Sequence, residues 1–235
     1  MYGSHDIPII LRSEKLSLSI EMEGDVKHYS RECFGETVNK IIHTKSSRIL
    51  INPVEPMSLP KELTPYLLIE FEKLVIIEAE SSIKVYLTFP IEIGVFISGK
   101  KKFEIIDVLT LANQKFTLYG NPRDGIICKY WSSNVHASMP ATEPMREGVI
   151  QLEIINTSTH LIEVTKAVFN AYAMKIYYTD DLVAMQAKMR VMAGEIAETD
   201  FINLPLKPSM RKSVELYTAR KVQVLGTKFV MENGI

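Results

Sequence analysis

The chain has 235 residues, of which 46% are hydrophobic, so it can bury the core of one large β domain or of two smaller ones. Its 27 Lys and Arg residues nearly balance its 28 Asp and Glu residues, and no global field therefore favours polyanions or anionic membranes. Charged residues interrupt the apolar stretches well short of the ~20 uncharged residues that a membrane helix requires, so we expect no membrane span.

The N-terminal residues and the cysteines indicate a reducing compartment. Residues 1–6 lack the basic region and the apolar core of a secretory signal. Cys33 and Cys128 lie far apart and form no C-x-x-C pair, whereas a disulfide framework needs more cysteines. We therefore predict two free thiols and a cytoplasmic protein.

Alternating apolar and polar residues predict strands in the first part of the chain. Leu16–Met22 places its apolar side chains on one face and its polar ones on the other. Residues 30–44 combine helical spacing with poor helix formers, and we interpret them as strands. Residues 47–54 predict a short strand that Pro53 and Pro56 end, because proline donates no ladder hydrogen bond.

The clearest period of two runs from Tyr66 to Val108. Apolar residues recur at every second position in several segments, which predicts half-buried strands. Ser98–Lys100 predicts a hairpin turn within this stretch. Asn121–Gly125 predicts a second turn, between the strands Phe116–Tyr119 and Ile126–Trp131, and we expect its closing glycine to take the left-handed conformation.

Residues 132–148 interrupt the alternation and predict a linker. They are rich in serine, proline and threonine and show no periodicity. We therefore divide the chain into an N-terminal β domain over residues 1–135 and a C-terminal β-sandwich domain over residues 145–235. The strands predicted beyond the linker are Val149–Ile155, Leu161–Phe169, Met174–Tyr178, Val183–Val191 and Val222–Met231.

Evenly spaced short strands with turn residues between them are typical of antiparallel sandwiches and barrels. The predicted fold is therefore all-β with little helix. We expect an antiparallel β-sandwich, either immunoglobulin-like or jelly-roll-like, built as two packed β domains.

No local motif indicates a catalytic or cofactor site. The five histidines do not have the spacing of metal ligands, and neither a nucleophile elbow nor a phosphate-binding glycine loop occurs. We expect no metal and no cofactor. The basic run Lys100–Lys102 is too narrow for a nucleic-acid interface, so we also expect no nucleic-acid partner.

Five residues are weak candidates for a binding site. Glu55 and Glu92 each follow a proline by two positions near a strand end, where their carboxylates would line a shared cleft. The alternative is that the prolines mark strand edges and the acids face water. Tyr130 and Trp131 end a strand, and with the loop that reaches His136 they predict a rigid aromatic platform. The alternative is that Trp131 plugs the end of the sandwich.

Several segments together resemble an uncharacterised archaeal protein family that is known only as a domain of unknown function. They are Asn52–Pro56, Leu59–Pro60, Leu68–Phe71 and Tyr86–Val95. The likeness covers most of the chain. These segments encode no known chemistry, so the resemblance implies an archaeal, intracellular origin and assigns no catalytic residue.

Two classes of function remain open. The preferred one is a non-enzymatic binding or scaffold module that holds a protein partner. The other is a small-ligand-binding protein or hydrolytic enzyme in which carboxylates or histidines converge in a barrel mouth or a sandwich cleft. Because free sheet edges must be covered, charged or paired, a homodimer is also expected.

Overall fold

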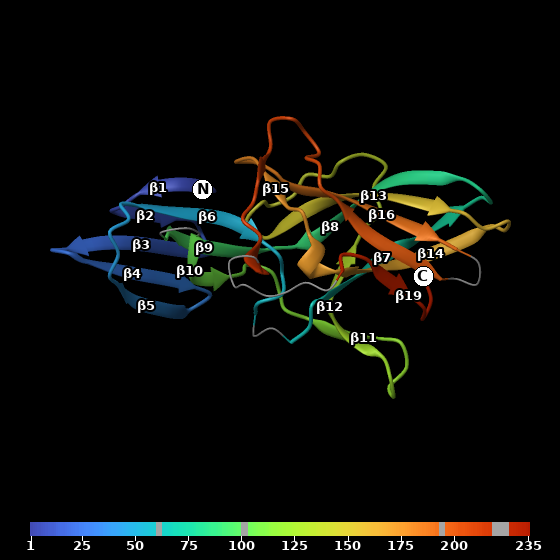
Figure 1. Ribbon diagram of the computed structural model, residues 1–235, viewed down its shortest axis with the longest axis horizontal. Helices are drawn as coiled ribbons and strands as arrows, with labels where there is room; N and C mark the ends of the chain where they lie inside the picture. The colour runs from blue at the N-terminus through green and yellow to red at the C-terminus, as the bar shows by residue number, and fades with distance from the viewer. Residues whose placement is uncertain (60–62, 100–102, 193–195, 218–225) are drawn as a thin grey trace.

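The computed structural model describes residues 1–59, 63–99, 103–192, 196–217 and 226–235. In these ranges the chain is built almost entirely from β-strands, with a 3₁₀ turn at Ala171–Ala173. The strands form two groups of sheets that lie end to end, the first lobe and the second lobe (Figure 1). The prediction of an all-β, sandwich-like fold with little helix is confirmed. No described helix is long and apolar enough to cross a membrane.

The first lobe contains two four-stranded antiparallel sheets, with the orders β1-β6-β9-β10 and β2-β3-β4-β5. Its strands are β1 (Gly3–Asp6), β2 (Ile9–Arg12), β3 (Leu16–Glu23), β4 (Val26–Cys33), β5 (Glu36–Ile42), β6 (Arg48–Val54), β9 (Glu92–Ser98) and β10 (Phe103–Leu109). β3, β4, β5 and β6 confirm the strands predicted before residue 55.

The second lobe pairs the sheet β11-β12-β7-β14 with the larger sheet β18-β15-β16-β13-β8, which β17 and β19 extend beside β16. Its strands are β7 (Tyr66–Ile77), β8 (Ser82–Pro90), β11 (Phe116–Tyr119), β12 (Ile126–Ser133), β13 (Glu147–Asn156), β14 (Ile162–Asn170), β15 (Tyr177–Tyr178), β16 (Val183–Val191), β17 (Ala197–Ile202), β18 (Arg211–Lys212) and β19 (Phe229–Met231). Of the strand predicted over Val222–Met231, residues 222–225 lie outside the described residues.

Two strand pairs differ from the predicted antiparallel arrangement. β12 runs parallel to β7, and β13 runs parallel to β16. Parallel neighbours need a long connection. Here strands of other sheets lie in the sequence between the two paired strands; for example, β9 and β10 of the first lobe come between β7 and β12. A local period of two does not indicate how the chain connects one strand to its neighbour in the sheet.

The chain crosses between the lobes from β6 to β7, from β8 to β9 and from β10 to β11 (Figure 1). The second crossing is almost continuous, because β8 ends at Pro90 and β9 begins at Glu92. The predicted domain division at residues 132–148 stays a prediction. In the structure these residues connect β12 to β13, and β13, which follows them in the chain, pairs with β8, which precedes them.

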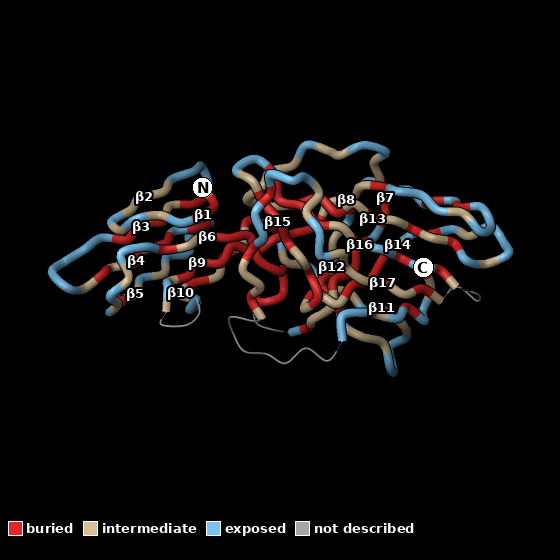
Figure 2. The backbone as a smooth tube through the Cα atoms, turned by 45° about the horizontal axis from the view of Figure 1, so that its top comes forward, coloured by how far each residue is buried: buried red, intermediate tan, exposed pale blue. Residues whose placement is uncertain are grey.

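Buried apolar side chains fill both lobes and continue through the joint between them (Figure 2). Phe89, Ile91 and Ile93 are completely buried where β8 gives way to β9. Burial of such side chains stabilises each by roughly 1.5–3 kcal/mol relative to exposure. The two lobes therefore share one continuous apolar interior.

The turn after β11 forms as predicted, but its left-handed glycine is a different one. The amide of Gly125 donates to the carbonyl oxygen of Asn121 at 2.8 Å. Positive φ falls on Gly120, at 98°, and not on Gly125. Gly125 is required for space instead, because a Cβ there would lie 2.5 Å from the carbonyl oxygen of Asn121.

The hairpin predicted around residue 99 is confirmed by the antiparallel pairing of β9 with β10. Phe103 lies opposite Ser98. The tip between them, with the basic run Lys100–Lys102, lies outside the described residues.

A buried polar cluster joins the two sheets of the first lobe. Asp107 of β10 accepts hydrogen bonds from the Tyr29 hydroxyl at 2.7 Å and from Arg31 Nε at 2.9 Å, both on β4. Lys40 of β5 donates to the same carboxylate at 3.1 Å. Arg31 and Asp107 are both buried, and Arg31 also reaches Glu36 at 3.3 Å, so the contacts of this cluster together offset the loss of water by the two charges.

Asp107→Ala should lower the free energy of unfolding by about 3–5 kcal/mol, because it removes the buried partner of Arg31 and leaves the guanidinium with only the exposed Glu36, at 3.3 Å. Urea denaturation measures this loss. Glu104→Ala is the matched control, since Glu104 is exposed on the same strand, and should change stability by less than about 0.5 kcal/mol. Equal losses in the two variants would contradict the structural role of the cluster.

Candidate functional site

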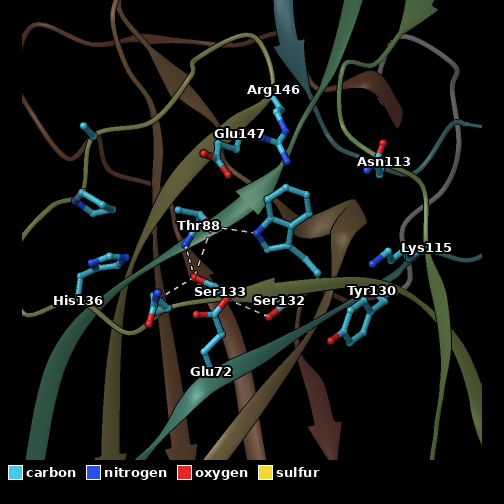
Figure 3. A pocket seen from close by; sticks show the side chains of 14 residues that line it. Glu72, Thr88, Asn113, Lys115, Tyr130, Ser132, Ser133, His136, Arg146 and Glu147 are labelled. Atoms are coloured by element: carbon cyan, nitrogen blue, oxygen red, sulfur yellow. Dashed lines mark hydrogen bonds between the residues drawn. The ribbon is translucent and has the colours of Figure 1, made fainter. Parts of the chain in front are cut away.

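A pocket of about 410 Å³ lies at one side of the second lobe, between β12 and the edge strand β8 (Figure 3). Its walls come from β7, β8, β12, the start of β13, the loop that follows β12 and the connection between β10 and β11. Tyr130, Trp131 and His136, three of the five residues singled out from sequence, line this one pocket.

The alternation of β12 places its two aromatic residues on different faces of the sheet. Trp131 pairs with Ile69 of β7 in register, and its indole N–H reaches Thr88 in the opposite sheet. Tyr130 points to the outer face, where its hydroxyl donates to Glu70. One strand end therefore supplies the pocket with an inner and an outer aromatic ring.

Trp131 is held in a fixed orientation. Its Nε1 donates to Thr88 Oγ1 at 2.9 Å, and the guanidinium carbon of Arg146 lies 6.0 Å from the ring centroid. The ring also packs against the apolar interior, which is the contact expected if Trp131 closes the end of the sandwich. Trp131 therefore contacts the core and also lines the pocket.

Hydrogen bonds also fix the edge of β8 beneath the pocket. Ser133 Oγ accepts from the amide of Thr88 at 2.8 Å and donates to the carbonyl oxygen of Asn134 at 2.8 Å. The backbone of His136 exchanges two hydrogen bonds with Tyr86, at 2.9 and 3.0 Å. The pocket therefore has a preorganised floor rather than a free strand edge.

The charged side chains around the pocket are balanced. Glu72 and Glu147 contribute carboxylates, and Lys115 and Arg146 contribute cations (Figure 3). Burial raises the pKa of Glu147, which neighbouring Glu143 raises further and Arg146 lowers. The site thus favours a polar ligand without a large net charge.

A second hollow of about 470 Å³ adjoins the first on the outer face of the sheet. Leu68, Leu118 and Lys166 are among its lining residues, and Tyr130 lines both hollows. The hydrogen bond to Glu70 raises the pKa of Tyr130 and fixes the ring between them. We refer to the two hollows, with Tyr130 between them, as the paired hollows.

Glu92 does not face water, so the alternative interpretation of this residue as a solvated acid at a strand edge is wrong. Its side chain is completely buried, and its carboxylate binds Lys129 Nζ at 2.9 Å. The amides of Ser58 and Leu59, on the crossing from β6 to β7, donate to it at 3.0 and 3.1 Å. Burial raises the pKa of Glu92 and lowers the pKa of Lys129, and their pairing opposes both shifts.

Glu55 is buried as well, which corrects the expectation of a solvated acid. Its carboxylate accepts the amide of Leu216 at 2.9 Å and so ties the first crossing to a segment near the C-terminus. Burial raises the pKa of Glu55 to about 8, although the Leu216 hydrogen bond lowers it. The strand ends next to Pro53 and Pro90 lie between the two lobes, inside the protein. Backbone amides that are buried there require hydrogen-bond acceptors, and the two carboxylates provide them. Neither Glu55 nor Glu92 lines the paired hollows, and a shared cleft would have to open before either met a ligand.

Sequence reasoning did not find Thr88, Arg146 and Glu147 as pocket residues. They come from β8 and from the segment around the start of β13, which no local motif connects to β12. Arg146 falls within the predicted linker. The available signal was indirect: a polar loop with His136 directly follows the single tryptophan of the chain.

Both cysteines are free thiols, as predicted. Burial raises the pKa of Cys128 to about 12. Among the residues that the structure describes, no three His, Cys, Asp or Glu side chains gather as metal ligands.

Comparison with family models matches residues 1–232 to a family described as a protein of unknown function (DUF432). No curated protein and no solved structure gives a significant match. The match covers both lobes. It also covers the residues that line the paired hollows, except Asn233.

Lys129→Met should lower the free energy of unfolding by about 3–5 kcal/mol, because the buried Glu92 loses its cationic partner and keeps only hydrogen bonds from backbone amides. The double variant Glu92→Gln with Lys129→Met should recover most of this loss in the same urea titration. Lys84→Met, at an exposed lysine, is the control. A double variant as unstable as Lys129→Met would show that the pair itself is not what matters.

Glu55 should make stability depend on pH. Its carboxyl binds a proton more tightly in the folded chain, so its contribution is fully present below pH 4.5 and is lost as the pH rises to about 8. We expect this group to lower the free energy of unfolding by up to ~1.4 kcal/mol per pH unit in that window. Glu55→Gln should remove this slope from urea titrations at several pH values, and an unchanged slope would refute the assignment.

Proposed function

We propose that this chain, which belongs to the DUF432 family of proteins of unknown function, is a non-enzymatic binding module that holds a segment of a protein partner in the paired hollows. The observation that supports this most is the pair Tyr130 and Trp131, fixed by hydrogen bonds at the rim of a pocket. The archaeal origin and the cytoplasmic location implied by the sequence stay predictions.

The shape of the site favours an extended segment. An extended chain directs successive side chains to opposite sides and rises about 3.3 Å per residue, so a few residues span neighbouring hollows. Tyr130, between the hollows, offers ring surface to such a segment. Aromatic rings provide large contact area and lose little conformational freedom on binding, which is why they dominate recognition surfaces.

The position of the predicted acids supports a binding role over hydrolysis. Glu55 and Glu92 accept backbone amides inside the joint, and both are buried. A hydrolytic pair must flank the bond it cleaves. These two carboxylates support the fold instead.

A second candidate function has one observation in its favour. Glu147 is half-buried with a raised pKa, whereas Glu72 is exposed at the same pocket. Two carboxyl groups in unequal environments are the usual arrangement of a general acid and its partner in glycoside hydrolysis. A saccharide would also use the aromatic rings, so saccharide binding or hydrolysis is the alternative to be tested.

Selection from a displayed library of random peptides tests the proposal, and the fluorescence anisotropy of each enriched peptide, labelled with a dye, measures its binding to the wild type and to every variant. Peptides enriched on the wild type should bind Trp131→Ala and Glu72→Lys at least about tenfold more weakly, since both changes alter the pocket. Phe103→Ala, at an exposed aromatic residue of the first lobe, is the control and should bind normally.

A glycan array incubated with the same proteins separates the two candidates. Peptide binding that survives Trp131→Ala and Glu72→Lys would overturn the proposed site. Saccharide binding that both variants abolish, without any pocket-dependent peptide, would overturn the proposed partner class in favour of the alternative.

A further inference from the structure

Most described edge strands carry a feature that prevents pairing with another chain. β10 contains a bulge between Ile105 and Asp107, and the pairing of β14 with β7 is irregular between Val164 and Lys166. β1, β2 and β11 are four residues long. The edge of β8 is occupied by His136. Such features are the usual protection of exposed sheet edges.

β5, at the margin of the first lobe in Figure 1, lacks this protection. It has seven residues, contains no proline and pairs with β4 without a bulge. No described strand pairs with its other side. Its lysine does not guard the edge, because Lys40 Nζ turns inward to Asp107 and to the carbonyl oxygen of Ile106. Ile41, by contrast, is 74% exposed.

The hairpin geometry identifies the unpaired backbone groups of β5. Cys33 and Glu36 flank a two-residue turn, and such a closing pair is hydrogen-bonded. Hydrogen bonding alternates along an antiparallel pair, so alternate residues bond to β4. The amides and carbonyls of Thr37, Asn39 and Ile41 therefore point to the open side.

We propose that β5 pairs antiparallel with β5 of a second copy of this chain, about a two-fold axis at Val38. In this register Glu36 lies opposite the partner's Lys40, and Thr37 lies opposite the partner's Asn39. The pairing forms about four interstrand hydrogen bonds and joins two four-stranded sheets into one.

Charge complementarity favours this register over its neighbours. The symmetric pairing places Glu36, which contacts Arg31 at 3.3 Å within its own copy, against the partner's Lys40, and does so twice. The partner's Lys40 keeps its contact with Asp107, so the pairing extends the two ion pairs across the interface, where opposite charges on facing strand positions attract. A two-fold axis at Lys40 would oppose two lysines. An axis at Asn39 would place Lys40 against the partner's Val38. The register centred on Val38 is therefore the one that the charges support.

The same register covers the exposed apolar residues at the ends of β5. Ile41 lies opposite the partner's Gly35, beside the partner's Phe34. Phe34 is 65% exposed and has a φ of 50°, a conformation that bulky side chains rarely adopt. A contact with Ile41 across the dimer gives this strained, exposed ring an apolar neighbour.

Oxidative cross-linking of the full-length protein tests the register. Val38→Cys places a thiol on the axis, in a non-hydrogen-bonded pair where the two Cβ atoms are closest, so a disulfide between copies should form readily. Asn39→Cys faces the partner's Thr37 and should remain largely uncross-linked. The wild type is the second control, because Cys33 and Cys128 are buried. Cross-linking of Asn39→Cys but not of Val38→Cys would overturn the register.

Light scattering over a concentration series tests the dimer itself, and it does not depend on Val38→Cys folding. The wild type should reach the mass of two chains, and Ile41→Lys should weaken dimerisation by at least about tenfold. A wild type that stays monomeric throughout overturns the proposal. Trp131→Ala should still dimerise, so failure of the dimer and failure of the proposed binding site are separate results.

Discussion

A buried ion pair between Glu92 and Lys129 fixes the joint of this protein. Glu92 begins β9 directly after the crossing from β8, and Lys129 lies on β12 of the second lobe. The amides of Ser58 and Leu59 donate to the same carboxylate from the other crossing. One carboxylate therefore links both lobes and two crossings. Removing two charges from water is costly, and the pairing, these hydrogen bonds and the donation from Lys129 Nζ to the carbonyl oxygen of Leu59 at 3.1 Å offset that cost.

The pair also connects the joint to the candidate site. Lys129 immediately precedes Tyr130 and Trp131, and it pairs in register with Leu67 of β7. Anchoring Lys129 limits the movement of β12, while Thr88 and Glu70 hold the two rings at its end. Binding sites gain affinity when their groups are ordered before the ligand arrives. The buried ion pair in the core thus helps to hold the strand end that carries the rings of the paired hollows.

How much the sequence predicts depends on how local each feature is. The strand Leu16–Met22 and the turn at Asn121 follow from residues within a few positions, and both are present. Tyr130 and Trp131 were found because aromatic residues at a strand end stand out locally. The parallel pairing of β12 with β7 could not be predicted, since it depends on the path of the chain through the first lobe.

Burial of the predicted acids shows the same limit in physical terms. Prolines near Glu55 and Glu92 correctly indicate strand ends, but a strand end faces water only if the chain turns back at the surface. Here the chain continues into the other lobe, so the strand ends lie inside and the acids meet backbone amides. Arg146 lies in a segment that resembles a linker and becomes a pocket wall only through the packing of β12 against β8.

Amide hydrogen exchange of Glu92→Gln compared with the wild type tests most directly whether the buried pair orders the site. If it does, the amides of β12 should exchange faster in Glu92→Gln, while those of β3 and β4 in the first lobe keep their wild-type rates. Unchanged protection of β12, or an equal loss throughout both lobes, would contradict this account.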